Sequence, residues 1–344
     1  MKSKMAAALL AGAVMLSAAP ALAQQVVLKV AHFWPPSAMG PSKVLVPWCD
    51  KIAKQSNDRM VCQIYPAMQL GGTPPQLIQQ AIDGVADIVW TLPGYTAGRF
   101  PAVEAFELPF MSNRAEPTSR ALWEYCQKYC ANDFKGVKNL AFNVHDEGYV
   151  HSNKRAIKTL ADFRGMKMRA PTRLTNKLLG ALGATPVAMP LPAVPEAVSK
   201  GVVDGYLLPW EVIPTMKLEE MTKFHSETDP KSPALYTAVF TIAMNQARYD
   251  GLPADLKKII DDNSGADFSA AIGKAWDESA AEARKKVTAS GAEFYTVPAS
   301  ELQSWRAAGD KLAESWVEEM TGRGYDGKAM LTDARGLIAK HTTK

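Results

Sequence analysis

Apolar and polar residues alternate along this chain in two different periods. A period of two predicts a strand, and apolar residues spaced three and four apart predict a helix. Residues 86–91 are almost all apolar, which is typical of a strand covered on both faces. The strands expected from these patterns are 26–32, 60–65, 86–91, 138–144, 166–170, 185–189, 204–208, 236–244 and 292–297. The expected helices are 43–55, 74–83, 116–132, 173–182, 193–200, 253 to about 290, and 300–323.

Strands and helices follow one another without any repeating sequence period. That order predicts a doubly wound α/β fold rather than a solenoid. The long helix from 253 to about 290 carries an apolar stripe that includes Phe268, Ile272 and Trp276. At ~1.5 Å per residue a helix of this length could run along two domains.

The first residues have the pattern of a secretory signal peptide. Lys2 and Lys4 precede a small-residue apolar segment, 5–19, and Ala21-Leu22-Ala23 matches a cleavage site. The apolar segment is shorter than the ~20 residues that a membrane-spanning helix needs. We therefore expect residues 1–23 to be removed and the mature protein to be exported to the periplasm. About 320 residues then remain, which suggests two domains at ~100–200 residues each.

The overall charge is close to balanced. The formal net charge of the whole chain is +4, and no block rich in lysine and arginine occurs. Nucleic acid is therefore not an expected partner.

The four cysteines are all expected in disulfides. An even count in an exported protein favours disulfides over metal or redox chemistry. Cys126 and Cys130 lie one helical turn apart, so they can be bridged only where the helix end relaxes. Cys49 and Cys62 flank a helix-to-strand loop. We favour Cys49–Cys62 and Cys126–Cys130, and with no histidine cluster nearby we expect no zinc site.

Arg169 is the strongest candidate for binding a ligand. It lies at the end of the strand 166–170, which Pro171 stops, and Thr172 can cap the helix that follows. Ligands of open α/β sheets bind at this edge, where a guanidinium can grip a carboxylate through two parallel hydrogen bonds. On local pattern alone, a surface arginine paired with a nearby acid is equally consistent.

Aromatic residues gather at the same predicted edge. Trp34, Trp90 and Trp210 each follow or end a strand in three separate βα units, and Tyr95 and Tyr149 have similar positions. A single aromatic residue in such a place is more often part of the core. Three together favour an aromatic wall around a ligand.

The remaining candidates have plainer interpretations. Glu211 could contact a ligand hydroxyl or cation, but a helix cap is the simpler role, and His32 is expected to be structural. The triplet 145–147 resembles catalytic equipment without a nucleophile and is better explained as a turn. No nucleophile elbow, zinc-protease motif, P-loop or dinucleotide fingerprint occurs. We expect no enzyme, no cofactor and no metal; a periplasmic hydrolase of aromatic esters is the alternative from another class.

Over essentially the whole mature sequence, the chain resembles the solute-binding proteins of TRAP transporters, the DctP family. The order and spacing of several segments carry the resemblance. They are Ala-His-Phe-Trp-Pro-Pro (31–36), Tyr-Pro-Ala-Met-Gln-Leu-Gly-Gly (65–72), Gly-Val-Ala-Asp-Ile (84–88), Gly-Arg-Phe-Pro (98–101), Glu-Leu-Pro-Phe (107–110), Asp-Phe-Arg-Gly-Met-Lys-Met-Arg-Ala-Pro (162–171) and Gly-Val-Val-Asp-Gly (201–205).

The resemblance implies a two-lobed, periplasmic-binding-protein-like (Venus flytrap) α/β fold with a long helix spanning both lobes. It implies that Arg169 binds the carboxylate of an organic acid, and that a monomeric receptor delivers this acid to the TRAP membrane permease subunits. The expected divisions are lobe I (24–146 and 236–275), lobe II (147–235 and 276–330) and a C-terminal tail (331–344). A sensory role for the same lobes stays open.

The chain departs from the sugar-acid and C4-dicarboxylate members that it resembles. Where such members carry an asparagine this chain has Leu208, and no arginine precedes Lys154 in the segment 147–153. These differences predict an aromatic or apolar monocarboxylate. Arg173 is the alternative, because a second cation in the cleft would restore a dicarboxylate.

Overall fold

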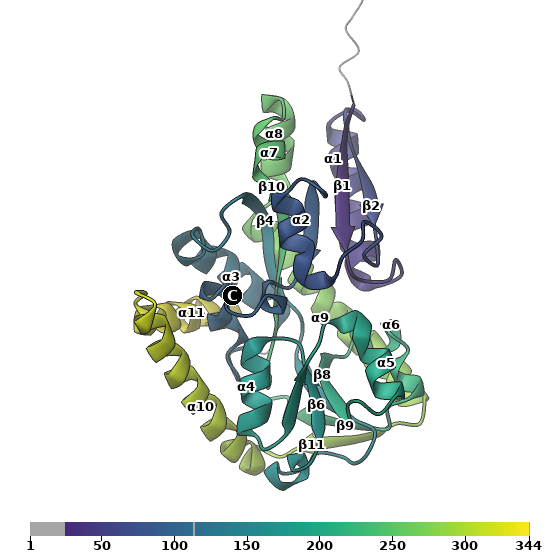
Figure 1. Cartoon of the computed structure of the whole chain (residues 1–344), viewed down its shortest axis with the longest axis vertical. Helices are drawn as coiled ribbons and strands as arrows, with labels where there is room; N and C mark the ends of the chain where they lie inside the picture. Colours follow the sequence, from purple (N-terminus) through teal and green to yellow (C-terminus); the bar gives the residue numbers. More distant parts are fainter. Residues whose placement is uncertain (1–24, 113, 344) are drawn as a thin grey trace, which may run out of the picture.

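Two separate β-sheets divide the chain into two lobes (Figure 1). This computed structural model describes residues 25–112 and 114–343, so the predicted signal peptide lies outside the described residues. The sheet of lobe I has the order β2-β1-β3-β10-β4, and the sheet of lobe II has the order β11-β9-β5-β8-β6-β7. The strands of lobe I are β1 (Val26–His32), β2 (Met60–Tyr65), β3 (Ile88–Thr91), β4 (Val137–Val144) and β10 (Val239–Asn245). Those of lobe II are β5 (Gly148–Ser152), β6 (Lys167–Ala170), β7 (Thr185–Ala188), β8 (Gly205–Pro209), β9 (Phe224–Thr228) and β11 (Glu293–Val297).

Each sheet is mixed because of the strands at which the chain changes lobe. The chain leaves lobe I after β4 and enters lobe II at β5, which pairs antiparallel with β8 and β9. It returns through β10, which pairs antiparallel with β3 and β4. The other pairings are parallel: β1 with β2 and β3, β6 with β7 and β8, and β9 with β11. The carboxyl ends of β6 and β8 therefore meet at one edge of the lobe II sheet, and β1 and β3 end together in lobe I.

Helices cover both sheets. They are α1 (Val46–Gln55), α2 (Leu77–Ile82), α3 (Ala115–Tyr129), α4 (Arg173–Ala181), α5 (Val194–Ser199), α6 (Val212–Thr215), α7 (Gln246–Asp250), α8 (Ala254–Asp262), α9 (Ala266–Ala289), α10 (Ala299–Gly322) and α11 (Gly327–Thr342). Figure 1 shows α9 between the two lobes, and α10 running from lobe II back to α11 beside α3. The predicted long helix that spans both lobes is α9: Ser269 accepts a hydrogen bond from Phe142 of lobe I, and Arg284 pairs with Glu227 of lobe II.

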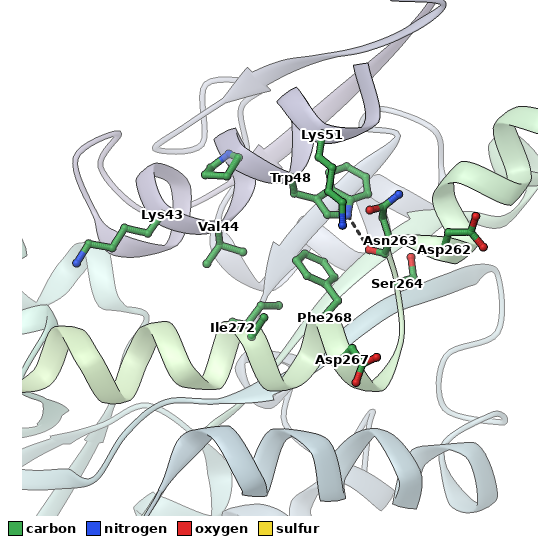
Figure 2. Close-up of a pocket in the computed structure, with 12 residues that line it drawn as sticks. Lys43, Val44, Trp48, Lys51, Asp262, Asn263, Ser264, Asp267, Phe268 and Ile272 are labelled. Carbon is green, nitrogen blue, oxygen red and sulfur yellow. Dashed lines mark hydrogen bonds between the residues drawn. The ribbon is translucent and has the colours of Figure 1, made fainter. Parts of the chain in front are cut away.

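The predicted helix 253–290 is broken, which corrects the sequence analysis. A turn at Asn263–Gly265 separates α8 from α9 (Figure 2). Gly265 has φ +95°, a conformation that L side chains rarely adopt, and its N–H donates to the carbonyl of Leu140. The indole of Trp48 donates to the carbonyl of Asn263 at 2.8 Å. The turn is thus tied to lobe I at two points, and a continuous helix could not make these bonds.

Several further elements differ from the sequence-based expectation, among them β5, α6 and α7, which were not expected. The segment from residue 331, expected as a tail, is helical to Thr342 within α11, where Lys340 and His341 bind Glu124 on α3. The strand β9 was not expected, because its sequence Phe-His-Ser-Glu-Thr lacks an apolar alternation; its polar residues His225 and Ser226 are buried.

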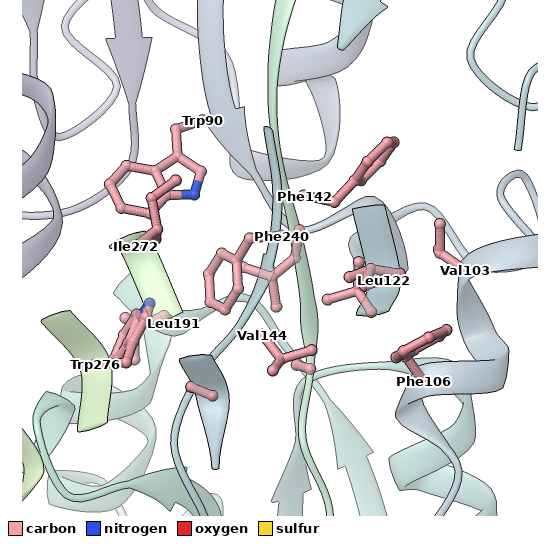
Figure 3. Packing of buried hydrophobic residues seen from close by; sticks show 14 of the residues in the cluster. Trp90, Val103, Phe106, Leu122, Phe142, Val144, Leu191, Phe240, Ile272 and Trp276 are labelled. Carbon is pink, nitrogen blue, oxygen red and sulfur yellow. The ribbon is translucent and has the colours of Figure 1, made fainter. Parts of the chain in front are cut away.

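The core of lobe I is rich in aromatic residues. Figure 3 shows Phe142 and Phe240 on either side of the central strands, with Leu122 and Phe106 from the helical side and Trp276 from α9. All five side chains are buried. This packing fixes α9 against the lobe I sheet, and Trp276 and Phe240 belong to it at the edge that faces lobe II.

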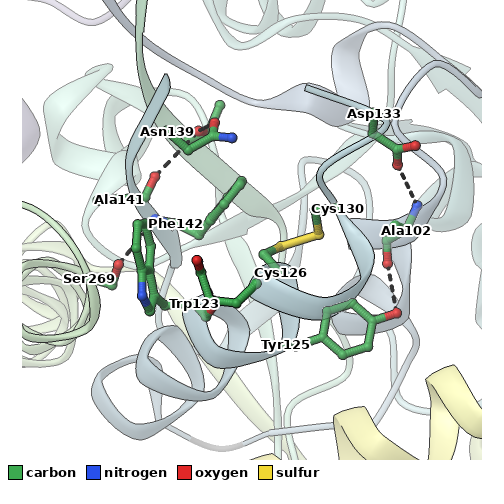
Figure 4. Close-up of a disulfide and its surroundings, with 12 residues drawn as sticks. Ala102, Trp123, Tyr125, Cys126, Cys130, Asp133, Asn139, Ala141, Phe142 and Ser269 are labelled. Carbon is green, nitrogen blue, oxygen red and sulfur yellow. Dashed lines mark hydrogen bonds between the residues drawn. A yellow bond between two sulfur atoms is a disulfide. The ribbon is translucent and has the colours of Figure 1, made fainter. Parts of the chain in front are cut away.

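Both predicted disulfides are present. Cys49 joins Cys62 with a Cα–Cα distance of 5.7 Å, and Cys126 joins Cys130 with a distance of 4.6 Å. The second bridge closes because α3 ends at Tyr129, so that Cys130 lies in the cap of the helix (Figure 4). The described chain has no free cysteine.

No helix in the described part of the chain is both long enough and apolar enough to cross a membrane.

Candidate functional site

A narrow cavity of about 30 Å³ lies where the two lobes meet. Residues of both lobes and of α9 line it: Phe33, Trp34, Leu92, Tyr95, His145, Arg169, Pro171, Leu191, Leu208, Pro209, Val212, Tyr236, Ala238, Phe240 and Trp276. The loops after β1 and β3 supply the wall from lobe I, and the ends of β6 and β8 supply the wall from lobe II.

Arg169 is held rigidly in the wall that lobe II contributes. It lies on β6, and Thr172 begins α4 as its N-cap, as the sequence predicts. The Arg169 Nε donates to the carbonyl of Met189 and Nη1 donates to the carbonyl of Leu207, both at 3.0 Å. These bonds use two of the five guanidinium N–H groups, and the guanidinium also forms a hydrogen bond with the Tyr95 hydroxyl.

Arg169 is a buried charge without a carboxylate partner. Its side chain is among the largest fully buried ones, with 1% of the residue exposed. Among the described residues no aspartate or glutamate forms an ion pair with it. The arginines that do form ion pairs, such as Arg59, Arg173 and Arg284, have side chains that are at least partly exposed. Burial lowers the pKa of Arg169, since a charged group in a low-dielectric site is disfavoured. An anion in the cavity would compensate this cost.

Two tyrosine hydroxyls accompany Arg169. The Tyr95 hydroxyl accepts a hydrogen bond from the backbone N–H of Leu191 at 3.0 Å, which links lobe I to lobe II. The Tyr236 hydroxyl is buried without a hydrogen-bond partner among the described residues. Burial raises the pKa of both tyrosines, and the Arg169 guanidinium partly offsets this effect. Both hydroxyls are therefore protonated at neutral pH and can donate to an anion.

Aromatic rings form the wall on the lobe I side. The Trp34 ring stacks on Phe240 with a centroid distance of 5.5 Å and lies 4.1 Å from Phe33. Trp276 lies 5.7 Å from Phe240. Leu92 and Leu208 add aliphatic surface. The body of a ligand in this cavity would meet apolar and aromatic groups, with polar donors at Arg169 and the tyrosines.

His145 closes the cavity without offering a charge. Its Nδ1 bonds the carbonyl of Asp146 at 2.5 Å, so Nδ1 carries the proton, and Nε2 accepts from the N–H of Ala238 at 3.0 Å. Burial lowers the pKa of His145 to about 4, and the positive charge of Arg169 acts in the same direction. His145 is neutral at physiological pH, and both ring nitrogens are used by the backbone.

Four of the nine predicted ligand residues line the cavity. They are Arg169, Trp34, Tyr95 and Leu208. Trp90 does not line it: its ring packs edge-on against Trp34 at 4.7 Å, behind the wall. Tyr149 and Trp210 border a separate surface pocket with Arg114 and Arg284, and the Trp210 indole donates to Glu227 at 3.0 Å.

Glu211 and Arg173 lie outside the cavity and link elements instead. Glu211 accepts from the N–H of Met39 at 3.0 Å, across the lobes; it occupies the N-cap position of α6, but its side chain makes no capping hydrogen bond. Arg173 binds Glu104 of lobe I through Nε (2.9 Å) and Nη2, and Nη1 contacts Glu319 of α10 at 2.7 Å. Its charge is already paired with carboxylates of the protein. Sequence position could not show this, because Glu104 and Glu319 are distant in the chain.

Several lining residues were not predicted from the sequence. Tyr236 and Trp276 carry unpartnered polar atoms, and Phe240 and Val212 supply apolar surface. Trp276 belongs to the apolar stripe of the long helix, which predicts a core position. Nothing in the local pattern of the predicted strand 236–244 distinguishes the cavity side, where Tyr236 and Phe240 lie, from its other face.

The polar groups of the cavity suit an anionic ligand. The polar groups left over in the cavity are hydrogen-bond donors, and among the described residues no group of three or more histidine, cysteine, aspartate or glutamate side chains is placed to hold a metal ion. Two lobes joined by crossing strands around one buried cavity define the class of periplasmic binding proteins, which close on a ligand by a hinge motion.

The chain belongs to the bacterial extracellular solute-binding protein family 7, DctP, whose sequence model matches residues 30–319. Among characterised relatives, it is 28% identical over 305 residues to the C4-dicarboxylate-binding periplasmic protein DctP of Rhodobacter capsulatus, covering 86% of this chain and 89% of that protein. The resemblance drawn from sequence motifs is confirmed.

Solved structures of TRAP solute-binding proteins share the fold. One from Rhodoferax ferrireducens, in complex with copurified benzoate, is 50% identical with a TM-score of 0.91, covering 93% of this chain and 99% of that one. Another, from an unidentified marine microbe and described as specific for aromatic acid ligands, was crystallised with 3-hydroxybenzoate. It is 46% identical with a TM-score of 0.90, covering 92% and 99% of the two chains.

Proposed function

We propose that this protein is the periplasmic receptor of a TRAP transporter for an aromatic monocarboxylate, which it delivers to the membrane permease subunits as a monomer. The observation that carries the proposal is the buried Arg169 guanidinium. It has no acidic partner among the described residues, and it faces a cavity with aromatic walls. A ligand carboxylate would accept two parallel hydrogen bonds from its free N–H groups and further bonds from Tyr95 and Tyr236.

The charge of the site favours one carboxylate over two. Arg169 is the only arginine or lysine among the residues that line the cavity. Arg173, the alternative second anchor, is paired with Glu104 and Glu319. A second ligand carboxylate would be buried against Leu92, Phe240 and similar groups without a counter-charge, which is costly.

The walls favour an aromatic body. Offset and edge-to-face contacts between a ligand ring and the rings of Phe33, Trp34 and Phe240 are worth ~0.5–1.5 kcal/mol each beyond the area that they bury. The two similar structures described above hold benzoate and 3-hydroxybenzoate, which supports this ligand class. Benzoate-, phenylacetate- and mandelate-like acids are the candidates, and branched 2-oxo acids are a second group with one carboxylate and an apolar body.

A C4-dicarboxylate or a sugar acid is the alternative within the family. The Rhodobacter capsulatus relative, which is named as a C4-dicarboxylate-binding protein, supports it only through a distant similarity of 28% identity. The polar groups that line the cavity are too few to bond the many hydroxyls of a sugar acid.

Ligand binding would couple to closure of the lobes. Tyr95 of lobe I bonds Leu191 of lobe II beside Arg169, so an anion at Arg169 would bind residues of both lobes at once. A ligand that contacts both lobes binds the closed form better and shifts the equilibrium toward it. The closed form is what the permease would recognise.

A thermal-shift screen with organic acids tests the proposal. A ligand at 100 times its Kd should stabilise the protein by about 2.7 kcal/mol, which is a clear rise in the unfolding temperature. We expect aromatic monocarboxylates to give this rise and the corresponding aromatic esters to remain unhydrolysed on incubation with the protein. Turnover of the esters would instead support the hydrolase alternative, and a screen without any stabilising carboxylate would contradict the receptor function.

A further inference from the structure

One residue that lines the cavity carries a polar group that a bound carboxylate at Arg169 does not explain. Trp276 lines the cavity from α9 with 1% of the residue exposed. Its indole Nε1 is buried and has no hydrogen-bond partner among the described residues. Buried indole N–H groups usually find an acceptor, because an unmade hydrogen bond costs the full desolvation of the donor.

Four other tryptophans of this chain follow that rule. Trp48 donates to the carbonyl of Asn263, and Trp210, Trp305 and Trp316 donate to glutamates at 3.0–3.3 Å. Trp90 also has a buried Nε1 without a partner in the described chain, but it packs behind the wall and does not line the cavity. Of the two indole N–H groups that are fully buried without a partner in the described chain, Trp276 therefore carries the one that belongs to a cavity-lining residue.

Trp276 lies on a different wall from the carboxylate anchor. Its ring neighbours are Phe240 at 5.7 Å and His145 at 6.1 Å. The ring nitrogens of His145 are both bonded to the backbone, so His145 offers no acceptor to the indole. The Arg169 guanidinium is fixed by the carbonyls of Met189 and Leu207 on the lobe II side.

We infer that Trp276 is a specificity-determining residue, whose Nε1–H donates to a second oxygen carried on the ring of the ligand. This inference rests on the proposed function, because it assumes a carboxylate at Arg169 and an aromatic body along Trp34 and Phe240. The ligand class is then a ring-oxygenated aromatic acid, with a hydroxyl or ether oxygen as the acceptor. An unsubstituted ring leaves the indole N–H unbonded and so binds less tightly.

Titration calorimetry with matched acids tests the inference. The wild-type protein and Trp276→Phe are titrated with benzoate and with 2-, 3- and 4-hydroxybenzoate. Phenylalanine keeps an aromatic wall and removes the N–H. For at least one hydroxybenzoate isomer, we expect Trp276→Phe to weaken binding about tenfold more than it weakens binding of benzoate. Trp90→Phe is the matched control, and it should change the affinity for all four acids by a similar factor.

A comparison on the wild-type protein alone keeps the test independent of the variant's folding. The methylbenzoates match the hydroxybenzoates in size and lack the acceptor. At the ring position whose oxygen accepts from Trp276, the hydroxybenzoate should bind about tenfold more tightly than the methylbenzoate substituted at the same position. Equal effects of Trp276→Phe on all four acids, or equal affinities for the hydroxyl and methyl compounds at every position, would overturn the inference while leaving the proposed function intact. Absence of binding by every aromatic acid would overturn both.

Discussion

Arg169 shows how one side chain can be prepared for a ligand by the backbone around it. Two carbonyls hold its guanidinium in place, and burial removes the water that would otherwise solvate the charge. Little side-chain freedom is left to lose when a carboxylate binds, so more of the charge-assisted hydrogen-bond energy contributes to affinity. The same rigidity makes the site intolerant of a different cation.

Arg169→Lys should therefore abolish useful binding of aromatic acids. A lysine ammonium is a point charge that cannot reproduce two parallel bonds, and it cannot also reach the carbonyls of Met189 and Leu207. Loss of one partner of a buried charge pair costs ~2–5 kcal/mol. Titration calorimetry measures the loss, with the unfolding temperature of the variant as a control for folding. A lysine variant that binds within a few-fold of the wild type would rule out bidentate recognition.

Glu107 should make stability fall as the pH rises. Burial raises the pKa of Glu107 from 4.5 to about 8, and nearby Glu104 acts in the same direction. Between pH 4.5 and 8 the folded protein keeps a proton that the unfolded chain has released, so stability is present at low pH and is lost as the pH approaches 8.

Glu107→Gln isolates this effect, because glutamine does not titrate and still has an oxygen to accept the N–H of Val239. Chemical denaturation of both proteins at pH 5, 7 and 9 gives the difference between their free energies of unfolding. The histidines titrate in both proteins, so their contributions cancel in this difference. We expect the wild type to lose of the order of a few kcal/mol relative to the variant across this range. A difference that does not change with pH would contradict the assignment.

At the scale of single residues, the sequence predicts those site positions that follow from a strand end. Arg169 and Trp34 are found because each lies at the carboxyl edge of a parallel strand. The same rule also selects Trp90 and Trp210, which lie behind the wall or in another pocket. Strand position does not say which way a side chain turns once the strand has ended. Tyr236 and Trp276 reach the cavity through tertiary packing, which has no local signal.

At the scale of elements, an ion-pair cluster joins α4 to lobe I and to α10. Arg173, at the first turn of α4, binds both Glu104 in lobe I and Glu319 on α10. The Trp316 indole also donates to Glu104 at 3.3 Å. The side chains of Arg173 and Glu104 are 19% and 6% exposed, so this pair is shielded from solvent far more than a surface ion pair. The cluster stabilises the arrangement in which the lobes enclose the cavity.

Arg173→Gln should weaken binding of every ligand by a similar factor, about tenfold. The substitution leaves Glu104 buried without its cation, and this cost falls on the closed form. Because Arg173 does not line the cavity, the ranking of ligands should not change. Calorimetry with benzoate and with phenylacetate measures the factor by which the substitution weakens binding of each acid. Lys177→Gln is the matched control, since Lys177 contacts only Glu319 and is 41% exposed. Selective loss of one acid would instead place Arg173 in contact with the ligand.

The order and type of most elements follow from hydrophobic periodicity, whereas their ends and interruptions depend on tertiary bonds. The alternation in residues 26–32 and the apolar segment before Thr91 predict β1 and β3 well. The break before α9 is encoded by Asn-Ser-Gly, but the apolar stripe on either side hides it. Periodicity does not predict β9, because buried positions of this strand hold polar residues such as His225.

At the scale of the whole molecule, several bonds cross between the lobes around one cavity. Tyr95 bonds Leu191, Glu211 bonds Met39, and Arg173 bonds Glu104. These contacts surround the cavity that holds Arg169, and the connections from β4 to β5 and from β9 to β10 pass between the lobes. The resemblance found in the sequence predicts this two-lobed architecture. It does not predict which charges are used for closure and which are left for the ligand, because that depends on pairs of residues far apart in the chain.

The central claim is that this cavity takes one carboxylate with an aromatic body. Titration calorimetry of the wild-type protein with benzoate and with succinate, under identical conditions, tests it most directly. One guanidinium without an acidic partner and walls of Trp34, Phe240 and Trp276 predict saturable one-to-one binding of benzoate and no measurable heat of binding from succinate. Tight binding of succinate together with silence from benzoate would contradict the account.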